Sequence, residues 1–247
     1  MIELDTLRYA RRANGETVPV IEDLSLRVEP GKIVALLGPS GCGKSTALDL
    51  AAGFLSPDSG RATVTGSLTC VFQAYGILPW LTASSNVRMG IRDKKAGKRA
   101  VDERVESLLA AVGLSDFADK RPHELSGGMR QRIALARAFA ADAQNVLLDE
   151  AFGALDPRTR KDAHSLLSRE IVRTGAAVLM VTHDTEEAAL LADTIVVVSA
   201  RPCAETLRVE ISEPRAARTR ESRAVRAARE KALAALAPAS RGPEYYL

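Results

Sequence analysis

The residues of this 247-residue sequence that point most directly to chemistry form a glycine-rich run, Gly38-Pro39-Ser40-Gly41-Cys42-Gly43-Lys44-Ser45-Thr46. Its spacing fits the pattern G-x-x-x-x-G-K-[ST], in which backbone N–H groups surround a phosphate chain. We expect Lys44 to reach the outer phosphates and the Ser45 hydroxyl to ligate Mg²⁺. The start of the following helix adds partial positive charge, which favours a di- or triphosphate. The run therefore predicts a binding site for a nucleoside triphosphate.

The segments around this run are those that such a loop needs. Residues 33–37 are continuously apolar, which predicts a buried strand, and residues 46–52 have the composition of a helix. Residues 2–9 and 24–29 alternate apolar and polar side chains, as strands do when one face is covered. Strands and helices alternate again over residues 146–198. This alternation predicts a largely parallel sheet with helices on both faces.

Composition and charge argue against several classes of function. The sequence is 46% hydrophobic and 26% charged, as in an ordinary soluble globular protein, and its net charge of +3 is too small to indicate a nucleic-acid partner. No apolar run approaches the roughly 18 to 20 residues that cross a bilayer, and the first residues lack the features of a secretory signal. The three cysteines, Cys42, Cys70 and Cys203, have no metal-ligand spacing, which indicates reduced thiols in the cytoplasm.

A second glycine-containing motif begins a predicted helix much later in the chain. Ser126, Gly127 and Gly128 stand at its start, where open N–H groups make a second anion site. The run from Leu125 to Gln131 resembles the signature motif of ATP-binding cassette (ABC) ATPases. In that family the signature serine and glycines grip the γ-phosphate that is bound to the phosphate loop of the other subunit. The resemblance therefore implies that this run acts in trans.

The remaining motifs follow in the order of that family. A buried run ends in the adjacent carboxylates Asp149 and Glu150 and resembles the Walker B strand. Asp149 would hold Mg²⁺ through water, and Glu150 would polarise the attacking water. Gln73 matches the Q-loop glutamine, which joins the Mg²⁺ and water site to a helical subdomain. Asp156 lies in a stretch that resembles the D-loop, and His183 matches the switch histidine that contacts the γ-phosphate.

Two positions leave alternatives open. Tyr9 sits where the family keeps an aromatic side chain that stacks on adenine, although an aromatic at a strand end is also common as packing. Asn145 occupies the first Walker B position, where the family usually has an apolar residue, unless it only precedes the strand.

The resemblance covers about residues 1–200 and implies an α/β fold. The implied fold has a P-loop NTPase (RecA-like) core with a predominantly parallel sheet, an N-terminal antiparallel β portion and a helical ABC subdomain at about residues 76–140. We expect residues 201–247 to be a C-terminal extension. Its Arg- and Ala-rich stretch, residues 215–236, predicts one exposed helix, and a loose tail follows.

The reaction that the resemblance implies is hydrolysis of ATP by in-line attack of water on the γ-phosphate. The protein would contribute positioning and charge stabilisation rather than covalent chemistry. Each chain has one phosphate loop and one signature, and the family joins them across a head-to-tail homodimer. We therefore expect two composite sites that close on ATP and one chain that is nearly inactive alone.

The residues that follow Gln73 suggest a membrane partner. Tyr75, Leu78 and Trp80 give this stretch an apolar, aromatic character, which predicts a groove for a helix of a separate permease. Trp80, the only tryptophan, could instead pack internally. Leu78-Pro79-Trp80 also resembles importer ATPases for nitrate, sulfonate, taurine and related small anions or pyrimidine precursors. This likeness implies a peripheral protein at the cytoplasmic face of the membrane, served indirectly by a periplasmic or extracellular solute-binding protein.

The alternative function is an ABC ATPase of an exporter, or of a DNA-repair or translation system. DNA-repair members of the family carry a long coiled coil or zinc-binding cysteines between the phosphate loop and the signature, and residues 47–124 are too short for these. Translation members carry two cassettes, whereas each motif occurs once here. The Leu78-Pro79-Trp80 stretch argues against an exporter.

Overall fold

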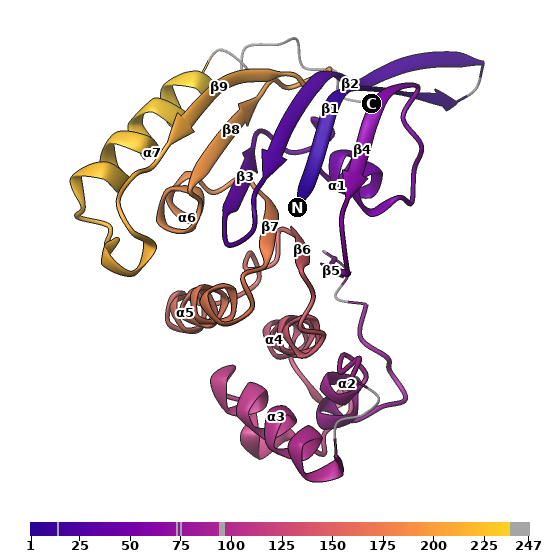
Figure 1. Cartoon of the computed structure of the whole chain (residues 1–247), viewed down its shortest axis with the longest axis vertical. Helices are drawn as coiled ribbons and strands as arrows, with labels where there is room; N and C mark the ends of the chain where they lie inside the picture. The colour runs from indigo at the N-terminus through magenta and orange to yellow at the C-terminus, as the bar shows by residue number, and fades with distance from the viewer. Residues whose placement is uncertain (14, 73, 75, 94–96, 238–247) are drawn as a thin grey trace. The chain divides into compact units, whose positions relative to one another are not determined.

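The computed structural model describes residues 1–247 except 14, 73, 75, 94–96 and 238–247 (Figure 1). The chain divides into two compact units. Unit 1 comprises Met1–Gly66 and Ala177–Leu247, and unit 2 comprises Ser67–Ala176. Within the described residues, no helix is both long enough and apolar enough to cross a lipid bilayer.

The N-terminal part of unit 1 is an antiparallel sheet of three strands. Its order is β2 (Glu16–Val28), β1 (Ile2–Ala13) and β4 (Ser59–Val64), with β1 antiparallel to both neighbours. Leu24 and Leu26 are buried while the residue between them faces solvent, because successive side chains of a strand point to opposite faces. The predicted antiparallel β portion is therefore confirmed.

A second set of strands in unit 1 is mostly parallel. β3 (Ile33–Leu37) pairs parallel with β7 (Ala177–Thr182) on one side and β8 (Thr194–Val198) on the other. Every residue of β3 and β7 is buried, as is typical of parallel strands that are covered on both faces. The strand predicted for residues 33–37 is confirmed.

Short helices follow β3 and β7, and an edge strand lies beside β8. α1 (Lys44–Ala52) comes after β3, and α6 (Thr185–Leu191) comes after β7. β9 (Glu205–Glu210) pairs antiparallel with β8 and was not predicted. Its residues are mainly polar and exposed, because an edge strand needs little apolar surface.

Unit 2 combines two parallel strands with a group of helices. β5 (Leu68–Val71) pairs parallel with β6 (Asn145–Asp149). The helices, in chain order, are α2 (Ala83–Arg88), α3 (Lys98–Ala111), the 3-10 helices η1 (Ser115–Phe117) and η2 (Pro122–Glu124), α4 (Gly127–Ala140) and α5 (Pro157–Thr174). α2, α3 and α4 contact one another, as Figure 1 shows. They lie within residues 76–140, the stretch predicted to be helical.

Asn145 belongs to the strand and does not merely precede it. It is the first residue of β6 and is fully buried. Its backbone N–H and its Nδ2 both donate to the carbonyl oxygen of Ser67, at 3.0 and 3.1 Å. A polar residue is therefore tolerated at this buried position because its amide is hydrogen-bonded.

An ion-pair cluster joins α3 to α5 inside unit 2. Arg104 on α3 contacts Oε2 of Glu170 on α5 at 2.7 Å, and Arg173 contacts the same oxygen at 2.7 Å. Asp142, which follows α4, pairs with both arginines. Glu170 is nearly buried, so this carboxylate needs the cations around it to offset its lost hydration.

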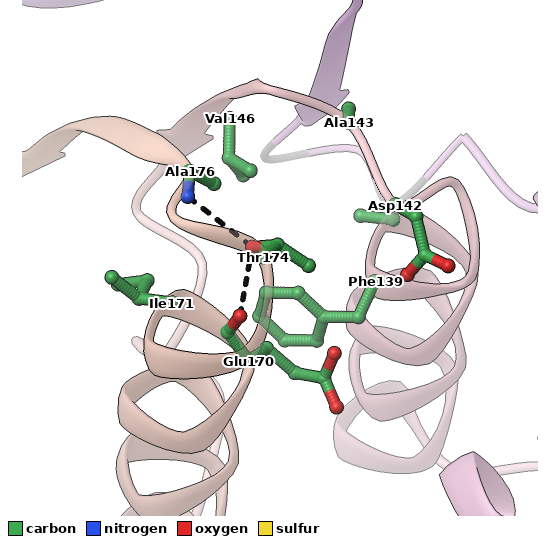
Figure 2. A pocket seen from close by; sticks show the side chains of 9 residues that line it. Phe139, Asp142, Ala143, Val146, Glu170, Ile171, Thr174 and Ala176 are labelled. Atoms are coloured by element: carbon green, nitrogen blue, oxygen red, sulfur yellow. Dashed lines mark hydrogen bonds between the residues drawn. The ribbon is translucent and has the colours of Figure 1, made fainter. Parts of the chain in front are cut away.

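Figure 2 shows a pocket beside this cluster. It is lined by Phe139, Asp142, Glu170 and Thr174, among others. The Thr174 hydroxyl donates to the carbonyl oxygen of Glu170 at 2.8 Å and accepts from the Ala176 N–H at 3.2 Å. These polar groups form hydrogen bonds with other residues of unit 2. None of the residues that line the pocket belongs to the predicted nucleotide site. The pocket is therefore part of the packing between α4 and α5.

The C-terminal helix differs from the prediction. α7 (Arg223–Leu236) begins later than residue 215, after the 3-10 helix η3 (Arg215–Ala217), and it packs against α6 and β9 (Figure 1). Its buried side chains are Val225, Ala228 and Ala232. The prediction of an exposed helix is therefore wrong for this face. The small apolar residues recur at helical spacing, but the surrounding arginines hid that pattern.

Arg218 is also buried, although it lies in the stretch predicted to form an exposed helix. Its guanidinium donates to the carbonyl oxygens of Ala192 (2.6 Å), Ile211 (3.2 Å) and Glu213 (2.8 Å). Burial lowers the pKa of Arg218, and the nearby Asp193 carboxylate acts in the opposite direction. These bonds fix the chain that leads into α7.

The contact between α2 and α4 gives a test of the packing. A Cβ atom at Gly90 would lie 2.1 Å from the carbonyl oxygen of Arg137 on α4. Gly90→Ala should lower the free energy of unfolding by about 1–3 kcal/mol, because a backbone atom cannot move aside as a side chain would. Urea unfolding measures this change.

Gly97→Ala is the matched control in the same unit. No atom lies within 4 Å of the Cβ position at Gly97, which precedes α3 with φ near −62°. Alanine is a poorer N-cap than glycine but also restricts the unfolded chain, so this substitution should change the free energy of unfolding by less than about 1 kcal/mol. Equal effects of the two substitutions would contradict the close packing of α2 on α4.

Candidate functional site

The predicted phosphate loop lies between β3 and α1 in unit 1. Lys44 is 5% exposed, and its Nζ donates to the carbonyl oxygens of Gly38 (2.9 Å) and Pro39 (2.7 Å). The Cys42 N–H donates to the same Pro39 oxygen at 3.4 Å. The ammonium group and this N–H therefore converge on the inner side of the loop. α1 has no acidic residue in its first turn, so its positive N-terminal end favours an anion.

Two glycines are required by the surroundings of the loop. A Cβ atom at Gly38 would lie 2.6 Å from Cγ2 of Val198. Gly43 has φ of +117°, and a Cβ atom there would lie 2.9 Å from the carbonyl oxygen of Val20. The loop is thus packed against β8 on one side and β2 on the other, so its N–H groups are held in place before a ligand binds.

His183 lies beside the phosphate loop at the same edge of the strands. In the pairing of β3 with β7, Leu37 is opposite Thr182. The next residues, Gly38 and His183, therefore leave the two strands together, at the carboxyl ends where α/β folds bind ligands. His183 is exposed in the turn that leads into α6. This placement suits a residue that would contact an outer phosphate.

Tyr9 is half-buried on β1 and lies opposite Ile21 of β2, next to irregularities in the strand register. Ile21 in turn forms a bridge with Cys203, and a Cβ atom at Gly43 would lie 3.2 Å from the Cys203 Cβ. Tyr9 is therefore linked to the phosphate loop through a short series of neighbours. Its stacking on adenine stays a prediction.

In unit 2, Asp149 ends β6 and Glu150 follows it. Glu150 has φ of +47°, an uncommon conformation for a residue with a side chain. Its carbonyl oxygen accepts hydrogen bonds from Nε2 of Gln131 (3.2 Å) and from the Gly153 N–H (3.2 Å). These bonds hold the strained turn, and strain of this kind is concentrated at functional sites.

Gln131 therefore differs from its predicted place. It was predicted to act in trans with the signature, but its side chain is 3% exposed and bonded to Glu150 of its own chain. Leu125 is likewise buried, at 5% exposed. The reason is helix geometry, because Gln131 lies on the face of α4 that packs into the unit.

The signature serine and glycines lie at the open end of α4. Ser126 is exposed and caps the helix by accepting from the Met129 N–H at 3.2 Å. A Cβ atom at Gly128 would lie 3.3 Å from the carbonyl oxygen of Ala154, in the predicted D-loop. Signature and D-loop are therefore adjacent within unit 2.

Asp156 caps α5 at the end of that D-loop. Its carboxylate accepts from the N–H groups of Arg158 and Thr159, both at 3.2 Å. Hydrogen bonds from Thr159 lower the pKa of the Asp156 carboxyl, so it is ionised at neutral pH. An ionised N-cap fixes the direction in which the D-loop enters α5.

The predicted Q-loop and permease contact are described only in part. Gln73 and Tyr75 lie outside the described residues. Trp80 is 67% exposed, so the alternative that it packs internally is wrong within this chain. Leu78 is half-buried, and its backbone N–H donates to Oδ1 of Asn86 at 2.7 Å.

Asn86 is a residue that the sequence analysis missed. It is fully buried on α2, and its Nδ2 donates to the carbonyl oxygens of Leu78 (3.1 Å), Leu81 (3.3 Å) and Thr82 (3.0 Å). These bonds fix the turn that exposes Trp80. A polar residue on the apolar face of a predicted helix is the signal that could have identified it.

The chain is similar to known proteins in sequence and in fold. The sequence profile described as ABC transporter matches residues 21–153. The chain is 41% identical over 197 residues to the taurine import ATP-binding protein TauB of Roseobacter denitrificans, which covers 76% of this chain and 74% of TauB. It is 46% identical over 190 residues to the sulfate/thiosulfate import ATP-binding protein CysA of Synechococcus elongatus, covering 72% of this chain and 55% of CysA.

A solved structure gives the same result for the fold. The ATP-binding cassette MJ0796, determined as a dimer in a post-hydrolysis state with ADP and inorganic phosphate, aligns with a TM-score of 0.78 and 26% identity. The alignment covers 87% of this chain and 100% of that one. The α/β fold expected from the sequence is therefore confirmed. The profile match and the identity to TauB show that the chain belongs to the ABC transporter family, among its ATP-binding proteins.

Proposed function

We propose that this chain is the ATP-hydrolysing subunit of an importer for a small anion of the sulfonate or sulfate class. It would work as a head-to-tail homodimer with a separate membrane permease and, indirectly, a solute-binding protein. The observation that carries the proposal is the 41% identity, over most of the chain, to a protein named for taurine import. The preserved phosphate loop and signature helix support ATP as the energy source.

We assign the phosphate loop to the β- and γ-phosphates of ATP. Phosphate oxygens would replace the carbonyl oxygens of Gly38 and Pro39 as acceptors for Lys44 Nζ. His183 leaves the neighbouring strand at the same edge and would bind the γ-phosphate from the side. Positioning and charge stabilisation of this kind are the main contributions of protein to phosphoryl transfer.

We assign Glu150 to the attacking water. A carboxylate can accept a hydrogen bond from water and so direct its lone pair at the γ-phosphate. The Glu150 backbone is held by Gln131 and Gly153, so the carboxylate is positioned by the packing of α4 rather than by the nucleotide. Gln131 is in this sense a positioning residue.

Mg²⁺ fits the oxygen donors that the ABC resemblance assigns to it, one in each unit of the chain. The Ser45 hydroxyl and the Asp149 carboxylate are hard oxygen ligands, and proteins usually hold Mg²⁺ with one or two such groups together with substrate phosphates and water. Among the residues that the structure describes, no group of three or more His, Cys, Asp or Glu could hold a metal alone. When bound with the nucleotide, the ion would neutralise charge on its phosphates.

The trans role of the signature rests on the exposure of Ser126. Its hydroxyl oxygen caps α4 while the O–H group can still donate to a phosphate. The glycines beside it leave the helix N-terminus open to a ligand of another chain. The dimer of MJ0796 shows that a related cassette assembles in pairs.

The coupling to a permease rests on Trp80. A large aromatic side chain that is 67% exposed at the head of a helical group is the kind of anchor that protein interfaces use. Asn86 holds the turn that presents it. We therefore propose that a cytoplasmic helix of the permease binds here, together with Leu78 and Tyr75.

Glu150→Gln should leave ATP binding unchanged and lower the hydrolysis rate by about 100-fold or more, because the amide keeps the shape but loses the base. Release of phosphate under saturating ATP measures the rate, and fluorescent-nucleotide titration measures binding. Glu106→Gln, an exposed substitution on α3, is the control and should change neither. Hydrolysis by Glu150→Gln near the unmodified rate would show that another group directs the water.

Ser126→Arg and Lys44→Ala should each abolish hydrolysis, whereas a mixture of the two chains should recover part of it. In a mixed dimer, one composite site contains both defects and the other contains neither. The isolated Ser126→Arg chain should still bind ATP, because its own phosphate loop is intact. Loss of ATP binding by that chain would place Ser126 in cis and contradict the dimer.

Trp80→Ala should weaken association with the permease by about tenfold or more, since truncating an aromatic anchor typically costs about 2 kcal/mol. ATP binding by the isolated chain should not change. Phe54→Ala removes an aromatic of similar exposure, 63%, from unit 1 and serves as the control. An equal loss of permease affinity in both variants would show that the docking surface is not at Trp80.

Reconstitution of the chain with the permease encoded beside it tests the function as a whole. Taurine, sulfate and nitrate, each with its binding protein, are compared as stimulants of ATP hydrolysis. Stimulation by taurine or sulfate is the expected result, and stimulation by nitrate alone would contradict the proposed class of anion. Failure to assemble with any adjacent permease would overturn the importer assignment, while ATP hydrolysis by the chain could still be intact.

A further inference from the structure

Two buried thiols meet beneath the phosphate loop. Cys42 belongs to the loop and Cys203 follows β8, and both side chains are fully buried in unit 1. The Cys203 thiol donates a hydrogen bond to the Cys42 sulfur. None of the family motifs described above accounts for Cys203 or for this contact.

The backbone around the pair is tightly fixed. The Cys203 N–H donates to the carbonyl oxygen of Val20 at 2.8 Å, and the Glu22 N–H donates to the Cys203 carbonyl oxygen at 3.1 Å. On the other side, Arg201 Nε donates to the Gly41 carbonyl oxygen at 2.9 Å. Cys203 is therefore held against the loop by its neighbours as well as by its own thiol.

The charge around Cys42 favours its thiolate. The hydrogen bond from Cys203 lowers the pKa of Cys42 to about 6, against the effect of burial, and Lys44 adds to the lowering. Lys44 Nζ lies 3.9 Å from the Cys42 sulfur. The same hydrogen bond raises the pKa of Cys203. Cys42 is thus the nucleophile of the pair, and Cys203 is placed to resolve its oxidised form.

We propose that Cys42 and Cys203 form a redox modification site, at which a peroxide converts the two thiols to a disulfide and closes the ATP site reversibly. The Cys42 thiolate attacks one oxygen of hydrogen peroxide, the O–O bond breaks, and a sulfenic acid and hydroxide form. The Cys203 sulfur then attacks the Cys42 sulfur and displaces hydroxide, which takes up the Cys203 proton as water. Two sulfurs are oxidised and one peroxide is reduced.

Burial selects the oxidant. Neither thiol is exposed, so a bulky alkylating reagent should reach them slowly. Hydrogen peroxide is close to water in size and can enter during the local openings that loops undergo. The site therefore discriminates by size between small oxidants and larger thiol reagents.

The disulfide should disturb ATP binding for a geometric reason. Sulfur atoms that share a hydrogen bond must approach to about 2.05 Å in a disulfide. Cys42 lies between Gly41 and Gly43, which have φ of +75° and +117° and carry N–H groups that surround the phosphates. Because Cys203 is fixed to β2, the loop must move, and its N–H groups leave the arrangement that phosphate requires.

This inference rests on the proposed ATP site, and the experiment separates the two. The Cys70→Ser chain, which keeps only the pair, is treated with hydrogen peroxide with and without saturating ATP-Mg. Peptide mapping without reduction identifies the sulfur state, and titration with a fluorescent ATP analogue measures affinity before oxidation, after it, and after dithiothreitol. Cys203→Ser in the same background retains a hydrogen-bond donor for Cys42 but cannot form the disulfide.

The expected result is a peptide pair linked through Cys42 and Cys203, an ATP affinity about tenfold or more weaker, and recovery with dithiothreitol. ATP-Mg should slow the linkage, because binding and oxidation exclude each other. Cys203→Ser should give no linked peptide. Both thiols remaining reduced under peroxide, or a linked form with unchanged affinity, would overturn the inference. Weak ATP binding by the reduced chain would instead count against the proposed function and leave the linkage itself measurable.

Discussion

The parallel pairing of β3 with β7 is the constraint on which the chemistry of unit 1 depends. Leu37 lies opposite Thr182, and the residues that follow these two are Gly38 of the phosphate loop and His183. A slip of one residue would move His183 by about 3.3 Å along the strand and reverse the side to which it points. Both strands are buried on both faces, so they lack the alternation of apolar and polar side chains that would fix their register. The shapes and volumes of the side chains must hold the register instead. The close approach of Val198 to Gly38 supplies part of that specificity.

Buried amide side chains perform a similar task in unit 2. Gln131 holds the Glu150 carbonyl, Asn86 holds the turn before Trp80, and Asn145 holds Ser67 beside the first residue of β5. An amide N–H group that is buried without an acceptor would be destabilising, so each of these residues favours the backbone arrangement that supplies its acceptor, although within the described residues Oε1 of Gln131 is buried without a hydrogen-bond partner. At Glu150 this compensates an unfavourable left-handed conformation. The unit thus fixes its functional turns by internal hydrogen bonds of its own chain.

Sequence reasoning succeeded where a pattern is local and failed where a contact is distant. The phosphate loop and its strand follow from consecutive residues, and the parallel sheet follows from the alternation of strands and helices. The edge strand β9 was missed because its residues are mostly polar, and the buried face of α7 was hidden by arginines such as Arg223 and Arg226. The bond between Gln131 and Glu150 joins residues 19 apart, and the contact of Cys42 with Cys203 joins segments that are far apart in the chain. The periodicity of apolar residues in the sequence does not predict contacts between such distant residues, because these contacts arise when complete helices and strands pack together.

The segment after β8 shows how such a distant contact can add a property without altering the reaction. Its backbone joins β2 through Val20 and Glu22, and Arg201 joins the loop through Gly41, so the attachment does not depend on the Cys203 thiol. A side chain of similar size at Cys203 could therefore preserve the support of the phosphate loop while removing its sulfur. The proposed sensitivity to oxidation can therefore be removed without changing ATP binding. ATP binding, in contrast, cannot be changed through the loop without also affecting Cys42. Any change in the loop that serves the nucleotide also moves Cys42, because its backbone N–H lies on the inner side of the loop and its thiol lies beneath it.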